Sequence, residues 1–320
     1  MTRMAVPTLL LPEYEAATVG PAAPDSRPFV SVIVPVYNDA ERLLLCLEAL
    51  EGQTYAPDRY EVIVVDNAST KPVAPLLAAF SHARPEYEPA AGSYAARNRG
   101  ISSSRAEILA FTDADCIPGR DWLEGGVAGM REQGARLIAG RIDVFPLDAS
   151  MPNAVELYEM IFAFAPQHHA QAGIAATANL FTERCVMDEV GVFDASLKSF
   201  GDVAWTSRAV SAGYEVAYCA GASVRHPARR SLAELRRRYA RFAGGHFDQG
   251  RRSRDQLLKE RIRALLMLGP PLRLARQVAT ARSIAGWDKK AGVIAVAYVA
   301  RLVYFLEWSR LELGGASRRR

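Results

Sequence analysis

Three stretches of the sequence decide the fold: FVSVIVPVYN at 29–38, YEVIVVDNAS at 60–69 and AEILAFTDADC at 106–116. Each begins with a run of aliphatic and β-branched residues, which is typical of a strand buried on both faces of a parallel sheet. A helical pattern of leucines separates the first two runs, from Asp39, its expected N-cap, to about Gln53. Strands alternating with helices predict an α/β fold with a mostly parallel sheet and helices on both faces.

The rest of the chain continues this alternation less regularly and then becomes helical. The run RLIAGRIDVF at 136–145 predicts a strand, and from Ser231 onward the apolar residues follow a helical spacing. We expect three parts: a disordered leader over 1–28, rich in alanine and proline, one domain over 29–228, and a basic helical extension over 229–320. Further elements are predicted as helices over 72–82, 93–104, 183–190 and 202–213 and as strands over 176–182 and 214–219.

Charge is divided unevenly along the chain. Residues 1–224 hold 16 Lys and Arg against 28 Asp and Glu, whereas residues 225–320 hold 23 against 7. The net charge of +4 therefore combines a body at −12 with a tail at +16. Such a tail predicts an anionic partner, and we expect residues 229–320 to bind an anionic membrane surface. No nucleic-acid recognition motif accompanies the basic residues, so no nucleic acid is expected as a partner.

The membrane prediction depends on one segment of the tail. Leu232, Leu235, Tyr239 and Phe242 follow a helical spacing with arginines among them. Such a helix can lie in a membrane interface, or its apolar residues can pack on the rest of the protein. The apolar run at 291–306 is shorter than the roughly 20 residues that span a bilayer, so it can be a core helix, a shallow anchor or an oligomer contact.

The cysteines and the N-terminus indicate the compartment. Four cysteines without a C-x-x-C pair fit neither a disulfide framework nor a zinc site. The N-terminal residues do not have the pattern of a signal peptide. We therefore expect a cytoplasmic protein, peripheral on the inner face of the cell membrane if the tail binds lipid.

Polar side chains stand where the three buried runs end. In an open parallel sheet, ligands bind outside the carboxyl ends of the strands. No G-x-G-x-x-G or P-loop sequence follows these runs, which argues against a dinucleotide-binding fold or an NTPase. The candidate ligand-binding residues at the three exits are Pro35, Tyr37, Asn38, Asp66, Asn67, Asp113 and Asp115.

These residues also have structural interpretations. Tyr37 can be a core residue or a platform under a base, and Asp66 can form an Asx-turn or bind a base or ribose. Asp113 and Asp115 can cap a turn, or they can bind Mg²⁺ or Mn²⁺, because these ions prefer carboxylate oxygens.

Other candidates lie away from these exits. Arg97 and Asn98 can form a solvated helix face or point at a bound nucleotide. Asp202 opens a predicted helix and can be a cap or a catalytic base, since both roles need an exposed carboxylate. His226 follows a strand-like run, where a lone histidine can be structural or a ligand.

Together, four segments resemble the inverting family 2 glycosyltransferases, which have the GT-A fold of nucleotide-diphospho-sugar transferases. They stand in the expected order and spacing between Phe29 and His226. The segments are VSVIVPVYNDAERLLLCLEAL, QTYAPDRYEVIVVDNAST, AARNRGISSSRAEILAFTDADC and VGVFDASLKSFGDVAWTSRAVSAGYEVAYCAGASVRH.

The resemblance implies a role for each candidate residue. Asp202 corresponds to the catalytic base, Asp115 to the principal ligand of Mn²⁺ or Mg²⁺, and His226 to a histidine near the metal and the diphosphate. Asp113 contacts the ribose or the metal. The implied nucleotide-sugar-binding residues are Pro35, Tyr37, Asn38, Asp66, Asn67, Arg97, Asn98 and Asp113, and the implied acceptor residues are Asn179, Trp205 and Arg208.

The implied activity is metal-dependent transfer of one sugar, with inversion, from a nucleotide-diphospho-sugar to a hydroxyl of a glycan or a lipid-linked acceptor. This reaction belongs to the synthesis of cell-surface polysaccharide or glycolipid. Asp202 would take the proton of the acceptor hydroxyl, and the metal would stabilise charge on the leaving diphosphate. The Q-x-x-R-W motif and membrane helices of the processive synthases are not evident, which favours transfer of a single sugar.

Two departures from the family pattern leave alternatives open. Where family members commonly read Gly-Glu-Asp and then Val-Asp-Leu, this chain has Gly201 in place of the glutamate and Ala204 in place of the second aspartate. A degenerate transferase domain could act as a non-catalytic scaffold at a membrane surface. A sugar-phosphate nucleotidyltransferase shares the fold class, but VPVYNDAERL lacks the glycine-rich basic loop that holds a triphosphate.

Overall fold

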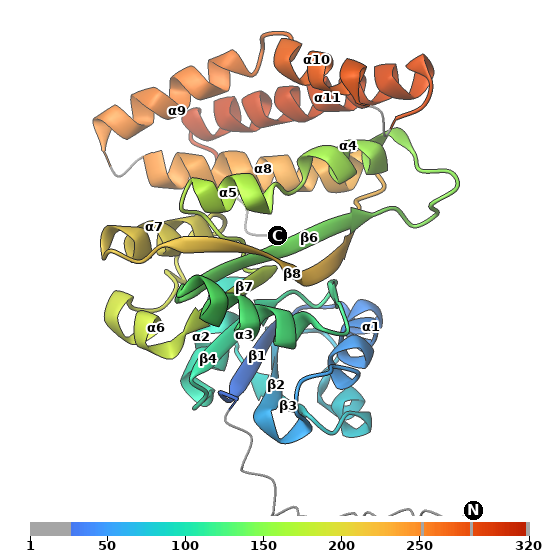
Figure 1. Cartoon of the computed structure of the whole chain (residues 1–320). Helices are drawn as coiled ribbons and strands as arrows, with labels where there is room; N and C mark the ends of the chain where they lie inside the picture. The colour runs from blue at the N-terminus through green and yellow to red at the C-terminus, as the bar shows by residue number, and fades with distance from the viewer. Residues whose placement is uncertain (1–26, 251–252, 282–283, 318–320) are drawn as a thin grey trace, which may run out of the picture.

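A computed structural model describes residues 27–250, 253–281 and 284–317 of the chain. The predicted leader therefore lies almost entirely outside the described residues. Within them, eight strands form one sheet in the order β3-β2-β1-β4-β7-β6-β8-β5 (Figure 1). The strands are β1 (Val30–Val36), β2 (Tyr60–Asp66), β3 (Ala83–Tyr87), β4 (Ile108–Thr112), β5 (Ile117–Pro118), β6 (Leu137–Phe145), β7 (Asn179–Glu183) and β8 (Val216–Pro227).

The three apolar runs quoted from the sequence form β1, β2 and β4. These strands are parallel neighbours, with β1 in the middle. β3 extends this parallel group beyond β2. β7 is antiparallel to both β4 and β6, while β6 and β8 are parallel. The predicted α/β fold with a mostly parallel sheet is therefore confirmed, with antiparallel pairing added in its second half.

Helices cover both faces of the sheet, as predicted. Successive side chains of a strand point to opposite faces, so Val32 of β1 packs in one hydrophobic cluster and Ile33 in another. Helices α1 and α3 contribute to the first cluster, and helices α2, α6 and α7 to the second. These helices are α1 (Ala40–Glu51), α2 (Ser93–Ser103), α3 (Trp122–Gln133), α6 (Arg184–Val190) and α7 (Gly201–Ser211).

Some predicted elements differ in kind or length. The helix expected over 72–82 is a six-residue 3₁₀ turn, η2 (Ala74–Ala79), followed by strand β3, which was not predicted. Leu77 is the only residue of this turn that is buried, so a longer helix here would cover little apolar surface. A second 3₁₀ turn, η1 (Pro57–Arg59), precedes β2. Asp39 occupies the cap position of α1, but its side chain binds Arg42 instead of capping the helix.

Strand β8 is twice as long as predicted. The expected strand stopped at Cys219 because the small residues after it carry no strand pattern. In the structure, β8 continues to Pro227 beside β6, and a shift in register between Gly140 and Arg141 accommodates the irregular middle. This extension carries His226 to the end of the sheet.

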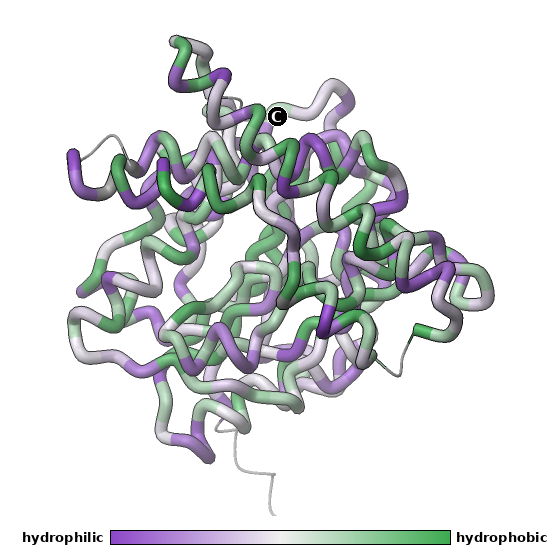
Figure 2. The backbone as a smooth tube through the Cα atoms, turned by 90° about the horizontal axis from the view of Figure 1, so that it is seen from above, coloured by the Kyte–Doolittle hydropathy of each residue, from purple (hydrophilic) through white to green (hydrophobic). Residues whose placement is uncertain are grey.

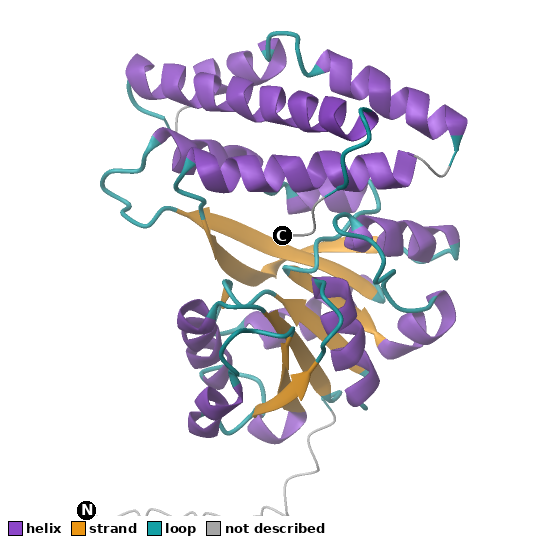
Figure 3. Cartoon of the chain, turned by 180° about the vertical axis from the view of Figure 1, so that it is seen from behind, coloured by secondary structure: helices purple, strands orange, loops and turns teal. Residues whose placement is uncertain are grey.

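A layer of helices lies above β6 and β8 in Figure 1, and Figure 3 shows the same layer from behind. Helix α4 of the predicted first domain packs in one cluster with α8, α10 and α11. Since this cluster crosses residue 228, the tail is packed as part of the whole molecule. The layer comprises α4 (Ala154–Phe162), α5 (Pro166–Gln171), α8 (Leu232–Gly250), α9 (Arg254–Leu266), α10 (Leu272–Thr280) and α11 (Trp287–Glu312).

Helix α11 contains the apolar run at 291–306. It is 26 residues long, and its most apolar 18-residue window has a mean hydropathy of 1.5, so it could cross a membrane by length and composition. The expectation that this segment is too short was therefore wrong. One face of α11, including Val293, Ala297, Ala300 and Tyr304, is buried, and 33% of the apolar window is buried.

Candidate active site

A cleft of about 610 Å³ lies where the ends of β1 and β4 meet α7, β8 and the helical layer. It is the place at which a sheet of this type binds ligands. Eight of the fourteen candidate residues line it. They are Pro35, Tyr37, Asn67, Arg97, Asp113, Asp115, Asp202 and His226.

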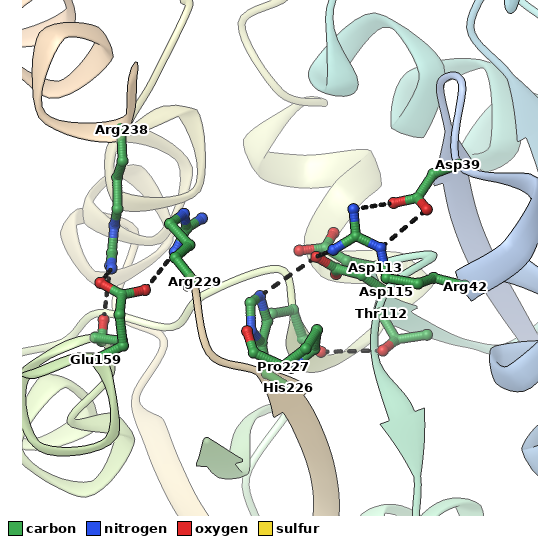
Figure 4. A network of polar contacts seen from close by, with 12 residues as sticks. Asp39, Arg42, Thr112, Asp113, Asp115, Glu159, His226, Pro227, Arg229 and Arg238 are labelled. Carbon is green, nitrogen blue, oxygen red and sulfur yellow. Dashed lines mark hydrogen bonds and ion pairs between the residues drawn. The ribbon is translucent and has the colours of Figure 1, made fainter. Parts of the chain in front are cut away.

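Asp115 and His226 meet at one side of the cleft (Figure 4). Nδ1 of His226 lies 2.8 Å from the carbonyl oxygen of Pro227. A carbonyl only accepts, so in the neutral ring Nδ1 carries the proton and Nε2 keeps its lone pair. Nε2 lies 3.8 Å from the Asp115 carboxylate. Two acceptor groups that face each other across this gap fit a cation between them.

Cys116 completes a group that the sequence analysis did not find. The ligand atoms of Asp115, Cys116 and His226 all lie within 4.8 Å of one another. Burial, followed by the charges of Asp115 and Asp113, raises the pKa of the Cys116 thiol well above its ordinary value. A neutral thiol is a weaker ligand than a carboxylate or an imidazole, so the two predicted residues are the better donors.

Asp113 has a different partner. Its carboxylate accepts a hydrogen bond from Nη2 of Arg97, whose side chain is 4% exposed. Nε of Arg97 is buried and has no hydrogen-bond partner in the part of the chain that the structure describes. A buried donor without an acceptor costs about 1–3 kcal/mol, so an oxygen of a bound ligand would stabilise this arrangement. Of the two predicted aspartates, Asp115 lies in the candidate metal group and Asp113 lies beside it.

Arg42 links α1 to this site. Asp39 holds its guanidinium at 2.9 Å, and Nη1 reaches to 3.6 Å from the Asp115 carboxylate. The carboxylates of the D-x-D motif thus each face an arginine. Arg42 was not among the sequence candidates, because one arginine in an amphipathic helix has no distinguishing pattern.

Asp202 lies in the first turn of α7, where the helix dipole favours a negative charge. Its carboxylate accepts hydrogen bonds from the Tyr94 hydroxyl at 3.2 Å and from the Thr177 amide at 3.4 Å. The predicted cap role is wrong, because Phe200 occupies the cap position. A Cβ atom on Gly201 would lie 2.6 Å from the Tyr94 ring, which explains why no glutamate stands there.

Three predicted nucleotide-binding residues do not line the cleft. Asn38 accepts hydrogen bonds from the backbone and hydroxyl of Thr70. Asp66 accepts from the Ser69 amide at 2.9 Å, which is the Asx-turn interpretation. Asn98 exchanges hydrogen bonds with the backbone of Phe193. These side chains fix the backbone around the cleft.

The three predicted acceptor residues are also structural. Asn179 is buried, binds the carbonyls of Arg141 and Ala222 and accepts from the Trp122 indole. Trp205 of α7 is buried in the core and donates to the carbonyl of Gly191. Arg208 donates to the carbonyl of Val192. A direct acceptor contact does not fit these positions.

Comparison with known proteins identifies the family of this chain. Residues 31–171 match the model of Glycosyl transferase family 2. The chain is 39% identical over 227 residues to Glycosyltransferase AglE of Haloferax volcanii, covering 68% of this chain and 73% of AglE. It is 30% identical over 242 residues to the Pre-mycofactocin glycosyltransferase of Mycobacterium tuberculosis, covering 71% of this chain and 49%, or about half, of that relative.

A solved structure extends the likeness to the fold. The mannosyltransferase PcManGT from Pyrobaculum calidifontis, in complex with GDP-Man and Mn²⁺, matches with a TM-score of 0.60 and 21% identity, covering 90% of this chain and 89% of that one. The fold is of the GT-A type, and the protein is a glycosyltransferase. It belongs to glycosyl transferase family 2.

Proposed function

We propose that this protein transfers one sugar from a nucleotide-diphospho-sugar to an acceptor hydroxyl, with inversion at the anomeric carbon, and that it uses Mn²⁺ or Mg²⁺. One observation carries the proposal: Asp115 and His226 turn two acceptor atoms toward each other, 3.8 Å apart, in a cleft that also holds Asp202. PcManGT, which shares the fold, is a mannosyltransferase in complex with GDP-Man and Mn²⁺, and this supports a similar ion and class of donor here.

Asp115 and His226 would hold the ion, with phosphate oxygens and water as its remaining ligands. When bound, the ion supplies Lewis-acid stabilisation of the negative charge on the leaving diphosphate. The buried Arg97, which lies beside Asp113 and has an unpaired Nε, would donate to the same end of the donor. Pro35, Tyr37 and Asn67 would line the nucleoside end of the cleft.

Asp202 would act as the general base. Hydrogen bonds from the Tyr94 hydroxyl and from the amides of Thr177 and Val203 fix the carboxylate at the wall of the cleft. From there it would accept the proton of the acceptor hydroxyl as that oxygen attacks the sugar. Attack on the face opposite the diphosphate inverts the anomeric carbon. The absence of a side chain at Gly201 leaves room for the Tyr94 ring, whose hydroxyl donates to Asp202. Since the change at Gly201 preserves this hydrogen bond to the proposed base, it favours an enzyme over a degenerate scaffold.

The test is donor hydrolysis by the intact chain across a panel of nucleotide sugars, with Mn²⁺, with Mg²⁺ and with excess EDTA. We expect release of one nucleoside diphosphate from one donor, and only with a metal present. Equal turnover in EDTA would overturn the metal proposal. Binding without any turnover, with every glycan and lipid-linked acceptor tried, would favour the scaffold. We place the reaction in the synthesis of cell-surface polysaccharide or glycolipid.

We also propose that the helical layer docks on an anionic membrane surface, through α9 and not through α8. Three of the four apolar residues of α8 named in the sequence are covered: Leu235 is 1% exposed, and Tyr239 and Phe242 pack in hydrophobic clusters, whereas Leu232 at the start of the helix is 49% exposed. Packing on the protein, one of the two interpretations of that segment, is therefore what the structure contains.

Helix α9 presents an uncovered apolar stripe instead. Leu258, Ile262 and Leu265, spaced by four and three residues, are 57%, 51% and 61% exposed. The exposed Arg254 lies one turn before Leu258 at the N-terminal end of the stripe, and the exposed Lys259 and Asp255 lie to one side of it. Seen from above, the outermost helices alternate hydrophobic and hydrophilic segments (Figure 2). Apolar side chains flanked by cations match an anionic bilayer surface, which would place the protein at the inner face of the cell membrane.

A further inference from the structure

Three arginines gather where the helical layer meets the cleft. Arg229 follows β8, and Arg238 and Arg241 belong to α8. All three line the cleft that holds Asp115 and Asp202. No candidate from the sequence lies at this end, so the cleft has a second, basic half that the proposed reaction has not yet used.

One buried carboxylate serves two of these arginines. Glu159 of α4, 1% exposed, lies 2.7 Å from Nη1 of Arg229 and 2.6 Å from Nη1 of Arg238 (Figure 4). Arg238 also donates to the carbonyl of Ala163 at 2.9 Å. This buried network holds both guanidinium groups in fixed positions at the wall of the cleft.

Arg241 has no such partner: among the described residues it makes no hydrogen bond or ion pair. Burial, followed by the positive charges of Arg229 and Arg238, lowers its pKa, and the smaller attractions of Tyr94 and Asp113 only partly oppose this shift. The local group thus has three cations and one anion. Partly buried charges without partners are costly, and such an arrangement becomes favourable when an anion binds. Arginine clusters bind phosphate through paired, charge-assisted hydrogen bonds.

The donor accounts for the other half of the cleft. A divalent ion at Asp115 would balance the two charges of the donor diphosphate. Asp113 and Asp115 already face Arg97 and Arg42. The excess positive charge at Arg229, Arg238 and Arg241 is therefore left for a different ligand. Apolar rings lie beside it, with Phe200 and Phe242 at 5.0 Å between centroids.

We propose that Arg229, Arg238 and Arg241 bind a phosphate group of the acceptor, so that the sugar is transferred to a phosphorylated molecule. This inference rests on the proposed glycosyl transfer and adds the class of acceptor. The phosphate can belong to a lipid or to a water-soluble sugar, and the apolar rings at the site accommodate either one.

The experiment measures binding of matched pairs of probes to the intact chain loaded with Mn²⁺ and the nucleoside diphosphate found by the donor panel. The pairs are farnesyl phosphate with farnesol, and glucose 1-phosphate with glucose. We expect at least one phosphate probe to bind roughly 10- to 100-fold more tightly than its unphosphorylated partner. Arg241→Gln should remove most of this difference and Arg241→Lys should retain part of it. The exposed Arg208, outside the cleft, supplies the control variant Arg208→Gln, which should match the wild type.

The donor and the fold are monitored separately. Binding of the nucleoside diphosphate with Mn²⁺ should be unchanged in Arg241→Gln, and the melting temperature should not fall, because one of three crowded charges has been removed. If Arg241→Gln weakened nucleotide binding more than phosphate binding, the cluster would serve the donor and the inference would be overturned. Equal binding of the phosphorylated and unphosphorylated probes would also overturn it. Absence of turnover with intact phosphate discrimination would count against the proposed reaction alone.

Discussion

Two regions of the molecule use arginine and apolar residues in opposite ways. Around β1, β2 and β4, apolar side chains are buried on both faces, and the charged groups at the strand ends stand in pairs, Arg97 with Asp113 and Arg42 with Asp115. In the helical layer, α9 leaves an apolar stripe uncovered and the arginines beside Glu159 outnumber their carboxylate. The strand ends thus balance each carboxylate of the candidate ion site with one arginine, whereas beside the helical layer the positive charges exceed the negative one.

The largest expected effect lies at the strand ends. Asp115→Ala removes a proposed ligand of the metal, so metal-stimulated donor hydrolysis should fall to background. The substitution lies in a loop before β5, and the melting temperature should change little without metal. Calorimetric titration with Mn²⁺ and a donor assay measure both effects. Undiminished metal-dependent turnover would mean that the paired carboxylates serve the fold and not the ion.

Asp202→Asn should have the next largest effect. Asparagine keeps the shape of the side chain but cannot take a proton, so transfer should slow by roughly 10²–10⁴-fold. Donor affinity should stay near the wild-type value, because the change affects the transition state. Steady-state transfer and equilibrium nucleotide binding check the two statements. Near-normal transfer would mean that another group takes the proton of the acceptor.

A smaller effect is expected where the two regions meet. His246 of α8 stacks on Phe200, the cap residue of α7, at 4.2 Å, and Nδ1 contacts the Tyr304 hydroxyl at 2.9 Å. Burial, followed by the charge of Arg263, lowers the pKa of His246 from 6.5 to about 4. Above pH 6.5 the ring is neutral in both the folded and the unfolded chain. Between pH 6.5 and 4 the unfolded chain binds more protons, so stability should fall by up to roughly 3 kcal/mol.

Denaturant melts from pH 7 to pH 4 measure this loss, and His246→Phe is the matched variant because it keeps a ring on Phe200 without a titrating group. The variant should lose less stability on acidification than the wild type. Parallel pH curves for the two proteins would show that the junction does not depend on a neutral histidine.

The smallest effect is expected on the outer surface. Replacing Ile262 by Glu puts a negative charge into the α9 stripe, and sedimentation with anionic vesicles at low salt should fall about 5-fold or more, since an apolar contact of about 1 kcal/mol is lost. Leu235→Ala on the buried face of α8 is the contrasting change, which should lower stability and leave vesicle affinity per folded molecule unchanged. If Ile262→Glu bound vesicles as well as the wild type, the stripe would have another partner.

The sequence predicted most of the sheet region and less of the helical layer, for a physical reason. A run of consecutive apolar residues, such as that of β1, indicates by itself that the strand is buried on both faces. The end of such a strand is also visible in the sequence, so Asp113 and Asp115 could be identified as candidates without any tertiary contacts. Periodicity in α8 and α9 defines an apolar face but not the surface that covers it, so the sequence left open whether the apolar residues of α8 pack on the protein or face a membrane. Arg241 was not predicted as a ligand-binding residue, because its proposed role depends on the nearby Arg229 and Glu159, which approach each other only in the folded chain.

The predicted acceptor residues have structural partners instead, and the sequence could not indicate this for the same reason. Asn179 stands at the start of β7, where an amide could equally face a ligand or the core, and only the positions of Trp122 and Arg141 decide between them. Gly201, in contrast, was noticed as a departure from the family and is explained by a contact with Tyr94 from a distant helix.

The pairing of β5 with β8 consists of two residue pairs, Ile117 with Arg225 and Pro118 with Val224, at the edge of the sheet. This short ladder brings Asp115 and His226 together, although more than a hundred residues separate them. Thermodynamic linkage then requires that an ion bound between them suppress opening of the ladder. Exchange of the amide hydrogens at 116–117 and 224–226 should therefore slow as Mn²⁺ is added, and would report occupancy of the ion site with no sugar present.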